Sequence, residues 1–87
     1  MRVFGEIDLA TAGAVQEPLV ELLDSGFCHV ALDLRKVTFM DSSGIRLLIS
    51  AHHQAEELGA TLSIVVGTAR IRQALELSGA MDYLGVS

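Results

Sequence analysis

The stretch Thr38–Gly44, TFMDSSG, leads directly into Ile45–Ile49, IRLLI, and so places two serine hydroxyls at the start of an apolar helix. Asp41 and Ser42 are both good N-cap residues, and either one puts Ser43 in the first helical turn. Backbone N–H groups in that turn lack partners within the helix. A phosphoryl group on Ser43 would therefore lie at the positive end of a helix. The same residues also suit a plain helix start, because caps of this kind are common.

Strand-like and helix-like segments alternate along the chain, which is typical of an α/β fold. Pro18 leaves the start of the first helix open, because Thr11 could cap it or it could begin near Glu17. Short connections predict right-handed crossovers and a mostly parallel sheet of about four strands with helices packed on it. Strands are expected at 2–7, 29–34, 61–66 and within 81–86, and helices at 11–24, 42–58 and 68–79.

The burial of side chains can also be predicted from spacing and neighbours. Cys28 precedes an apolar run, and we expect it to be a buried packing residue and not a reactive thiol. Along the helix at 42–58, helical spacing predicts one buried face. The residues on that face are Leu48, Ala51, Ala55 and Leu58, with Leu47 beside them.

Ser43 comes after the central strand expected at 29–34. In open α/β sheets, functional sites collect beyond the carboxyl ends of the strands. Cap chemistry and sheet topology therefore both place the candidate site at Asp41, Ser42, Ser43 and Gly44.

Length and charge exclude several classes of function. With 87 residues, the chain is expected to form one small domain, residues 1–87. Six basic residues against eleven acidic ones give a net charge of −5, and the scattered basic residues argue against nucleic acid as a partner. The apolar runs are too short to span a membrane and there is no secretion signal, so we expect a cytoplasmic protein.

Three parts of the sequence together resemble a known family. The run Phe39–Gly44, preceded by Leu32–Leu34 and by Gly5–Asp8, is similar to the STAS domain of anti-sigma factor antagonists over essentially the whole chain. The resemblance implies that Ser43 is phosphorylated by a cognate anti-sigma factor that is itself a serine kinase. The unphosphorylated antagonist would sequester the anti-sigma factor and free a sigma factor, and a phosphatase would reverse the modification. Asp8 would belong to the same functional surface.

The family usually carries another strand ahead of the segment at 5–8 and a further helix after the last strand. The resemblance therefore implies that this chain lacks the usual first strand and last helix. A missing leading strand would leave an unpaired sheet edge, and self-association into a homodimer would cover it.

Several residues are candidates for contact with the partner. Beside the buried face of the helix, Ile45, Ile49 and His52 form a stripe. Of these, Ile45 and Ile49 join Asp8 and the run 41–44 as candidates. The same stripe also suits the edge of the core, because a small domain needs such residues for packing. Ser42 is a second possible phosphate acceptor, but the family motif places the acceptor at Ser43 and Ser42 is also suited to capping.

Catalysis, metal binding and a cofactor are not expected. The Gly-x-Ser-x-Gly elbow is absent, and His52 and His53 lie about 14 Å along the helix from Ser43 at about 1.5 Å per residue. His29 is the histidine left as a possible base. His52 and His53 also point about 100° apart and have no third ligand at suitable spacing. The alternative to the antagonist role is a STAS scaffold or sensory module, either in a stress-sensing assembly or as a domain of a larger protein.

Overall fold

The structure, a computed structural model, describes residues 1–77, 85 and 86. Its strands form one sheet in the order β1-β2-β3-β4, and each neighbouring pair is parallel. The expected α/β fold with a largely parallel sheet is therefore confirmed. The elements follow in the order β1 (Arg2–Ile7), α1 (Ala12–Asp24), β2 (His29–Met40), α2 (Ser42–Glu57), β3 (Thr61–Val65), α3 (Ala69–Leu77) and β4 (Gly85–Val86).

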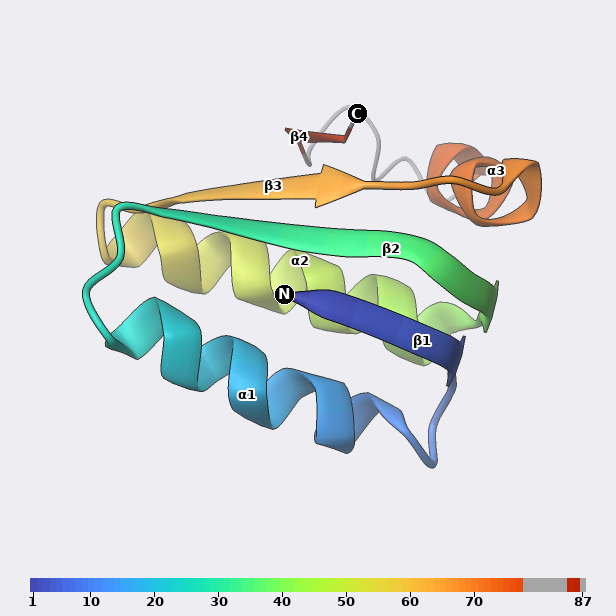
Figure 1. Cartoon of the computed structure of the whole chain (residues 1–87), viewed down its shortest axis with the longest axis horizontal. Coiled ribbons are helices and arrows are strands. Elements are labelled where there is room, and N and C mark those ends of the chain that lie inside the picture. Colours follow the sequence, from blue (N-terminus) through green and yellow to red (C-terminus); the bar gives the residue numbers. More distant parts are fainter. Residues whose placement is uncertain (78–84, 87) are drawn as a thin grey trace.

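Helices α1 and α2 run side by side along one face of the sheet, and α3 lies beyond the carboxyl end of β3 (Figure 1). Along β2, Val30, Leu32 and Leu34 are buried, while the residues between them are half-buried or exposed. This period of two is expected for a sheet with one face on the core. Buried apolar side chains from β1, α1, β2, α2, β3 and α3 form a single hydrophobic core. Among the described residues, no polar or charged residue is buried.

The structure resolves where the first helix begins. Helix α1 starts at Ala12, directly after Thr11, and continues through Pro18 to Asp24. Pro18 is exposed, so its ring does not disturb the core. Two other predicted helix signals, Gly59 after α2 and Thr68 before α3, agree with the structure. Gly59 has a φ of +71° just beyond α2, and the Thr68 hydroxyl accepts the Ile71 N–H of α3 at 3.3 Å.

Strand β2 is longer than predicted, because it continues to Met40 instead of ending at Leu34. It pairs with β3 through Asp33 and then with β1 as far as Met40. Arg35 and Lys36 do not end the strand, since both remain exposed while Val37 is buried again. The charged pair was therefore a poor signal of a strand end.

Two burial predictions were wrong. Leu58 is 51% exposed, because α2 ends at Glu57 and Leu58 turns away as the C-cap residue. Cys28 is also exposed, since it lies in the loop between α1 and β2, before the alternating pattern begins. The predicted helix end at Gly79 and the strand residues 81–84 lie outside the described residues. Over the part of the chain described, no helix is long and apolar enough to cross a membrane.

Candidate functional site

The candidate site lies where β1 and β2 end side by side. Ile7 and Met40 are register partners, and the Asp41 N–H donates to the Ile7 carbonyl at 3.2 Å. Asp8 follows directly after β1 and Asp41 directly after β2. Pairing of the two strands therefore brings these aspartates together, although they lie 33 positions apart in the sequence. The structure thus brings Asp8 next to Asp41, and contact of Asp8 with a partner stays a prediction.

Asp41, and not Ser42, caps helix α2. Its backbone is extended, with φ −100° and ψ −167°, and its Oδ1 accepts the Ser43 N–H at 2.8 Å. Its carbonyl oxygen accepts the N–H groups of Gly44 at 3.1 Å and Ile45 at 3.3 Å. Ser42 is then the first helical residue and is exposed, while Ser43 is half-buried. Several orphan amides of the first turn are therefore already satisfied by Asp41.

Asp8 closes the turn that leads from β1 into α1. Its Oδ1 accepts the N–H groups of Ala10 and Thr11, each at 3.0 Å. The Thr11 hydroxyl accepts the Asp8 N–H at 2.9 Å and donates to the Glu6 carbonyl at 2.8 Å. Thr11 precedes the helix as predicted, but its side chain makes no cap hydrogen bond and instead holds this turn. The carboxylate of Asp8 thus has a structural role in shaping the site.

Gly44 is buried where α2 starts against the sheet. A Cβ atom built on Gly44 would overlap the Met40 side chain and approach Ile7 Cγ2 to 3.0 Å. A larger residue would force the Met40 side chain or the start of the helix to move. Close packing therefore favours glycine here, and it lets Ser43 sit next to the turn that Asp8 closes.

Between α1 and α2 lies a groove with a volume of about 280 Å³, which we call the Ser43 groove. Leu9, on its rim, is 84% exposed. Leu9 was not among the predicted site residues, because its exposure on the rim depends on how α1 and α2 pack together and not on the local sequence. The lining residues are Leu9, Ala12, Gln16, Ser43, Arg46, Leu47 and Ser50.

Ile45 and Ile49 do not line this groove. Both are half-buried, and Ile45 packs against the hydrophobic core. The structure therefore favours the edge-of-core reading for Ile45, while part of each side chain remains accessible.

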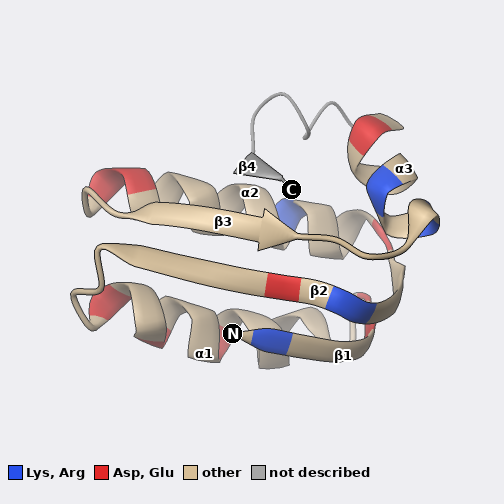
Figure 2. Ribbon diagram, turned by 45° about the horizontal axis from the view of Figure 1, so that its top comes forward, with Lys and Arg blue, Asp and Glu red and all other residues tan. Residues whose placement is uncertain are grey.

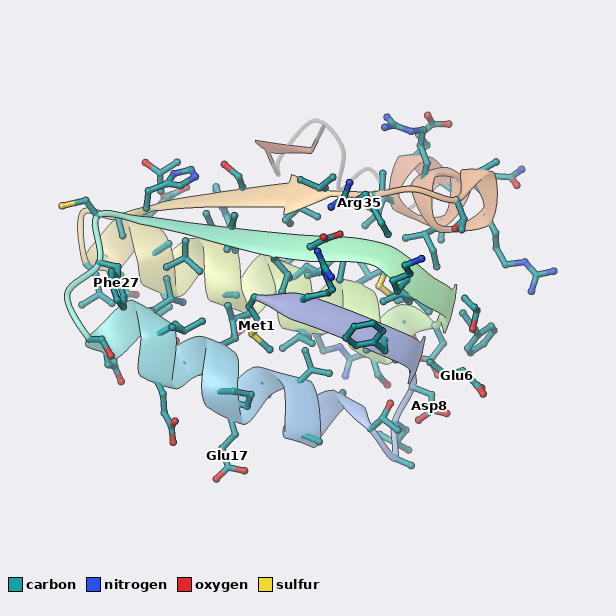
Figure 3. The ribbon with its side chains drawn as sticks, in the orientation of Figure 1. Met1, Glu6, Asp8, Glu17, Phe27 and Arg35 are labelled. Atoms are coloured by element: carbon teal, nitrogen blue, oxygen red, sulfur yellow. The ribbon has the colours of Figure 1, made fainter. Side chains whose placement is uncertain are left out.

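A charged cluster lies on the sheet, away from the groove. Arg35 donates from Nε to Asp33 Oδ1 at 3.0 Å and from Nη2 to Oδ2 at 2.9 Å, and Arg2 Nε lies 3.4 Å from the same Oδ2. The hydrogen bonds from Arg35 hold the pKa of the Asp33 carboxyl well below its usual range. Figure 2 shows these charges on β1 and β2, and Figure 3 shows Arg35 over the sheet and Asp8 beyond the strand ends.

The histidines are not placed to act on Ser43. His29 begins β2, whereas Ser43 follows the end of that 12-residue strand, and His29 Nε2 lies 3.3 Å from Ser63 Oγ. His52 Nε2 lies 2.6 Å from Glu56 Oε1, further along α2. A nucleophile needs its base within hydrogen-bond reach, so this geometry gives Ser43 no histidine base. No group of three or more metal-ligating side chains occurs in residues 1–77, 85 and 86.

These features define a small parallel α/β domain in which the candidate serine lines an open groove. The family model of the STAS domain matches residues 1–87, and the chain belongs to the STAS domain family. It is 25% identical over 87 residues to an anti-sigma-B factor antagonist of Bacillus subtilis strain 168, and the match covers all of this chain and 79% of that protein.

Solved structures show the same fold. The crystal structure of an anti-sigma factor antagonist from Mycobacterium paratuberculosis has a TM-score of 0.89 at 22% identity, covering 98% of this chain and 72% of that one. The Bacillus cell fate determinant SpoIIAA in its phosphorylated form has a TM-score of 0.72 at 20% identity, covering 99% of this chain and 78% of that one. The family resemblance predicted from the motif is therefore confirmed.

Proposed function

We propose that this chain is an anti-sigma factor antagonist that is switched by phosphorylation of Ser43. In the unphosphorylated state it binds an anti-sigma factor that is also a serine kinase, and a sigma factor is released. The kinase transfers phosphate from ATP: the Ser43 oxygen bonds to the γ-phosphorus, ADP leaves and the hydroxyl proton is released. A phosphatase returns the antagonist to its binding form. The relative named as an anti-sigma-B factor antagonist, which matches this chain along its whole length, supports the regulatory role.

One observation carries the proposal to Ser43: this residue lines an open groove at the start of α2, directly beside the turn closed by Asp8. A kinase can reach a hydroxyl at such a place without unfolding the domain. The exposed Leu9 offers the partner an apolar contact on the rim. The proposed docking surface comprises Asp8, Leu9, Asp41, Ser42, Ser43 and the accessible parts of Ile45 and Ile49. Gly44 is buried and shapes this surface from beneath.

The switch would act by local electrostatics. Phosphorylation adds about −1.5 to −2 charges, and here the new charge would join the Asp41 carboxylate that already caps α2. In a docked interface, a dianion that meets an acidic or apolar surface costs several kcal/mol, and each ~1.4 kcal/mol is tenfold in affinity. Within the free domain the phosphate stays at the surface, so no refolding is needed.

The test is phosphorylation by candidate anti-sigma factor kinases with ATP, read by intact mass and by site mapping. We expect one added phosphate on Ser43, none on Ser43→Ala, and normal modification of Ser42→Ala as the matched control. Ser43→Asp should bind the partner at least tenfold more weakly in calorimetry, while Ser43→Ala should bind as tightly as the unaltered protein.

Two results would contradict the proposal. Modification of Ser42 in place of Ser43 would move the acceptor by one residue. Failure of every candidate kinase to modify or bind the chain would favour the scaffold or sensory role instead.

A further inference from the structure

Among the residues that the structure describes, none pairs with the cation Arg46, which lines the Ser43 groove. It lies three residues after Ser43 on α2, and both residues line the groove. Its side chain makes no hydrogen bond or ion pair with the described residues, whereas Arg2 and Arg35 are committed to Asp33. Residues three apart on a helix are neighbours, about 5 to 6 Å between Cβ atoms. The guanidinium can therefore reach an anion carried by Ser43.

The backbone is poorly placed to neutralise such an anion. The Ser43 N–H already donates to Asp41 Oδ1, and the Gly44 and Ile45 N–H groups already donate to the Asp41 carbonyl. A phosphate on Ser43 could bind these N–H groups only by displacing their bonds to Asp41. It would also lie close to the Asp41 carboxylate. Like charges this close disfavour the fully ionised phosphate unless a cation compensates.

We propose that Arg46 is the cation within the domain that binds the phosphate on Ser43, and that it acts as a positioning residue. Its planar guanidinium can donate two parallel hydrogen bonds to phosphate oxygens. This inference rests on the proposed function only in taking Ser43 as the modified residue.

The pairing has a consequence for the switch. Before modification, the groove presents a free cation that can receive an acidic group of the partner. After modification, Arg46 is engaged by the phosphate, so the groove gains an anion and loses its available cation in one step. Both changes weaken the docking of an acidic partner segment.

The experiment places phosphoserine at position 43 during translation, so that no kinase is needed. Phosphorus NMR then follows the second ionisation of the phosphate in the unaltered sequence and in Arg46→Gln, Arg46→Lys and Arg70→Gln. Arg70 is exposed on α3 and provides a control with the same loss of charge. Circular dichroism of each variant checks that it is folded.

We expect the acid dissociation constant of the phosphate to fall roughly threefold or more in Arg46→Gln, because loss of a nearby cation raises its pKa. Arg46→Lys should retain part of the effect, and Arg70→Gln should match the unaltered sequence. Equal titrations for Arg46→Gln and Arg70→Gln would overturn the assignment. Because the phosphate is installed without a kinase, a failed kinase assay would not affect the titration result. If a kinase modified Ser43 but Arg46→Gln left the titration unchanged, the proposed function would stand and only the role of Arg46 would be rejected.

Discussion

Gly44 is the residue whose size the structure constrains most directly. Gly44→Ala should destabilise the domain by roughly 1 to 3 kcal/mol, because the new methyl group overlaps the Met40 side chain in a packed region. The gain in helix propensity, about 1 kcal/mol for alanine over glycine, offsets only part of that cost. Urea denaturation monitored by circular dichroism measures the change.

Gly13→Ala is the matched control for this substitution. Gly13 is also near the start of a helix, but a Cβ atom there meets no atom within 4 Å. This variant should be as stable as the unaltered chain or more stable by about 0.5 to 1 kcal/mol. If both alanine variants behaved alike, the packing argument for Gly44 would be wrong.

Asp33 should make the stability depend on pH. The hydrogen bonds from Arg35 lower its pKa in the folded state, so the unfolded chain takes up the proton first as the pH falls. The stabilisation is present above the unfolded pKa of about 3.9 and is lost as the pH falls toward the folded value. Asp33→Asn should therefore have a lower free energy of unfolding than the unaltered protein at pH 7. This difference in stability should become smaller in acid.

Urea midpoints between about pH 7 and pH 2 measure this difference in stability. The difference should begin to decrease below about pH 5. Glu57→Gln is the control, because Glu57 is exposed and has no ion pair with any residue that the structure describes. If the difference in stability between Asp33→Asn and the unaltered protein stayed constant with pH, the ion pairs of Asp33 would contribute nothing to stability.

At the scale of the element, α1 tolerates a proline that should weaken it. Pro18 lies in the middle of the helix Ala12–Asp24, where it cannot donate the usual bond to the carbonyl four residues earlier. Pro18→Ala should stabilise the protein by about 1 to 2 kcal/mol, since the restored bond outweighs the ~0.4 to 1 kcal/mol lost by freeing the unfolded chain.

Urea denaturation checks the effect of Pro18, with Glu17→Ala as the control at the neighbouring exposed position. The control should change stability by less than about 0.5 kcal/mol. A less stable Pro18→Ala variant would mean that the proline ring itself makes a favourable contact on α1.

At the scale of the whole molecule, β1 lies at the edge of the described sheet. Phe4 on this strand is 66% exposed, and edge strands present unpaired backbone groups to other chains. We therefore still expect a homodimer formed through this edge. Size-exclusion chromatography with light scattering should show a mass that rises with concentration.

Phe4→Lys should shift the equilibrium toward the monomer, because a charge on an edge strand opposes pairing. Leu77→Lys, which places the same charge on an 81% exposed residue of α3, should leave the equilibrium unchanged. A monomer at the highest attainable concentration would contradict the predicted homodimer.

The sequence alone determined the alternation of strands and helices, the glycine end of α2, the Thr68 cap and the helix start at which the candidate site 41–44 lies. These features depend on hydrophobic period and cap chemistry, which act between residues a few positions apart. The choice between Asp41 and Ser42 as cap stayed open, because both side chains are suitable and only the backbone conformation of Asp41 distinguishes them.

Only the tertiary structure decided the features that depend on distant partners. Strand β2 continues past Arg35 because β1 pairs with it as far as Met40. Leu58 and Cys28 are exposed because none of the described helices and strands covers them. Leu9 and Arg46 line one groove because α1 and α2 pack side by side on the sheet. Local sequence patterns carry no record of such contacts, which arise only when segments 30 or more residues apart are brought together by a shared core.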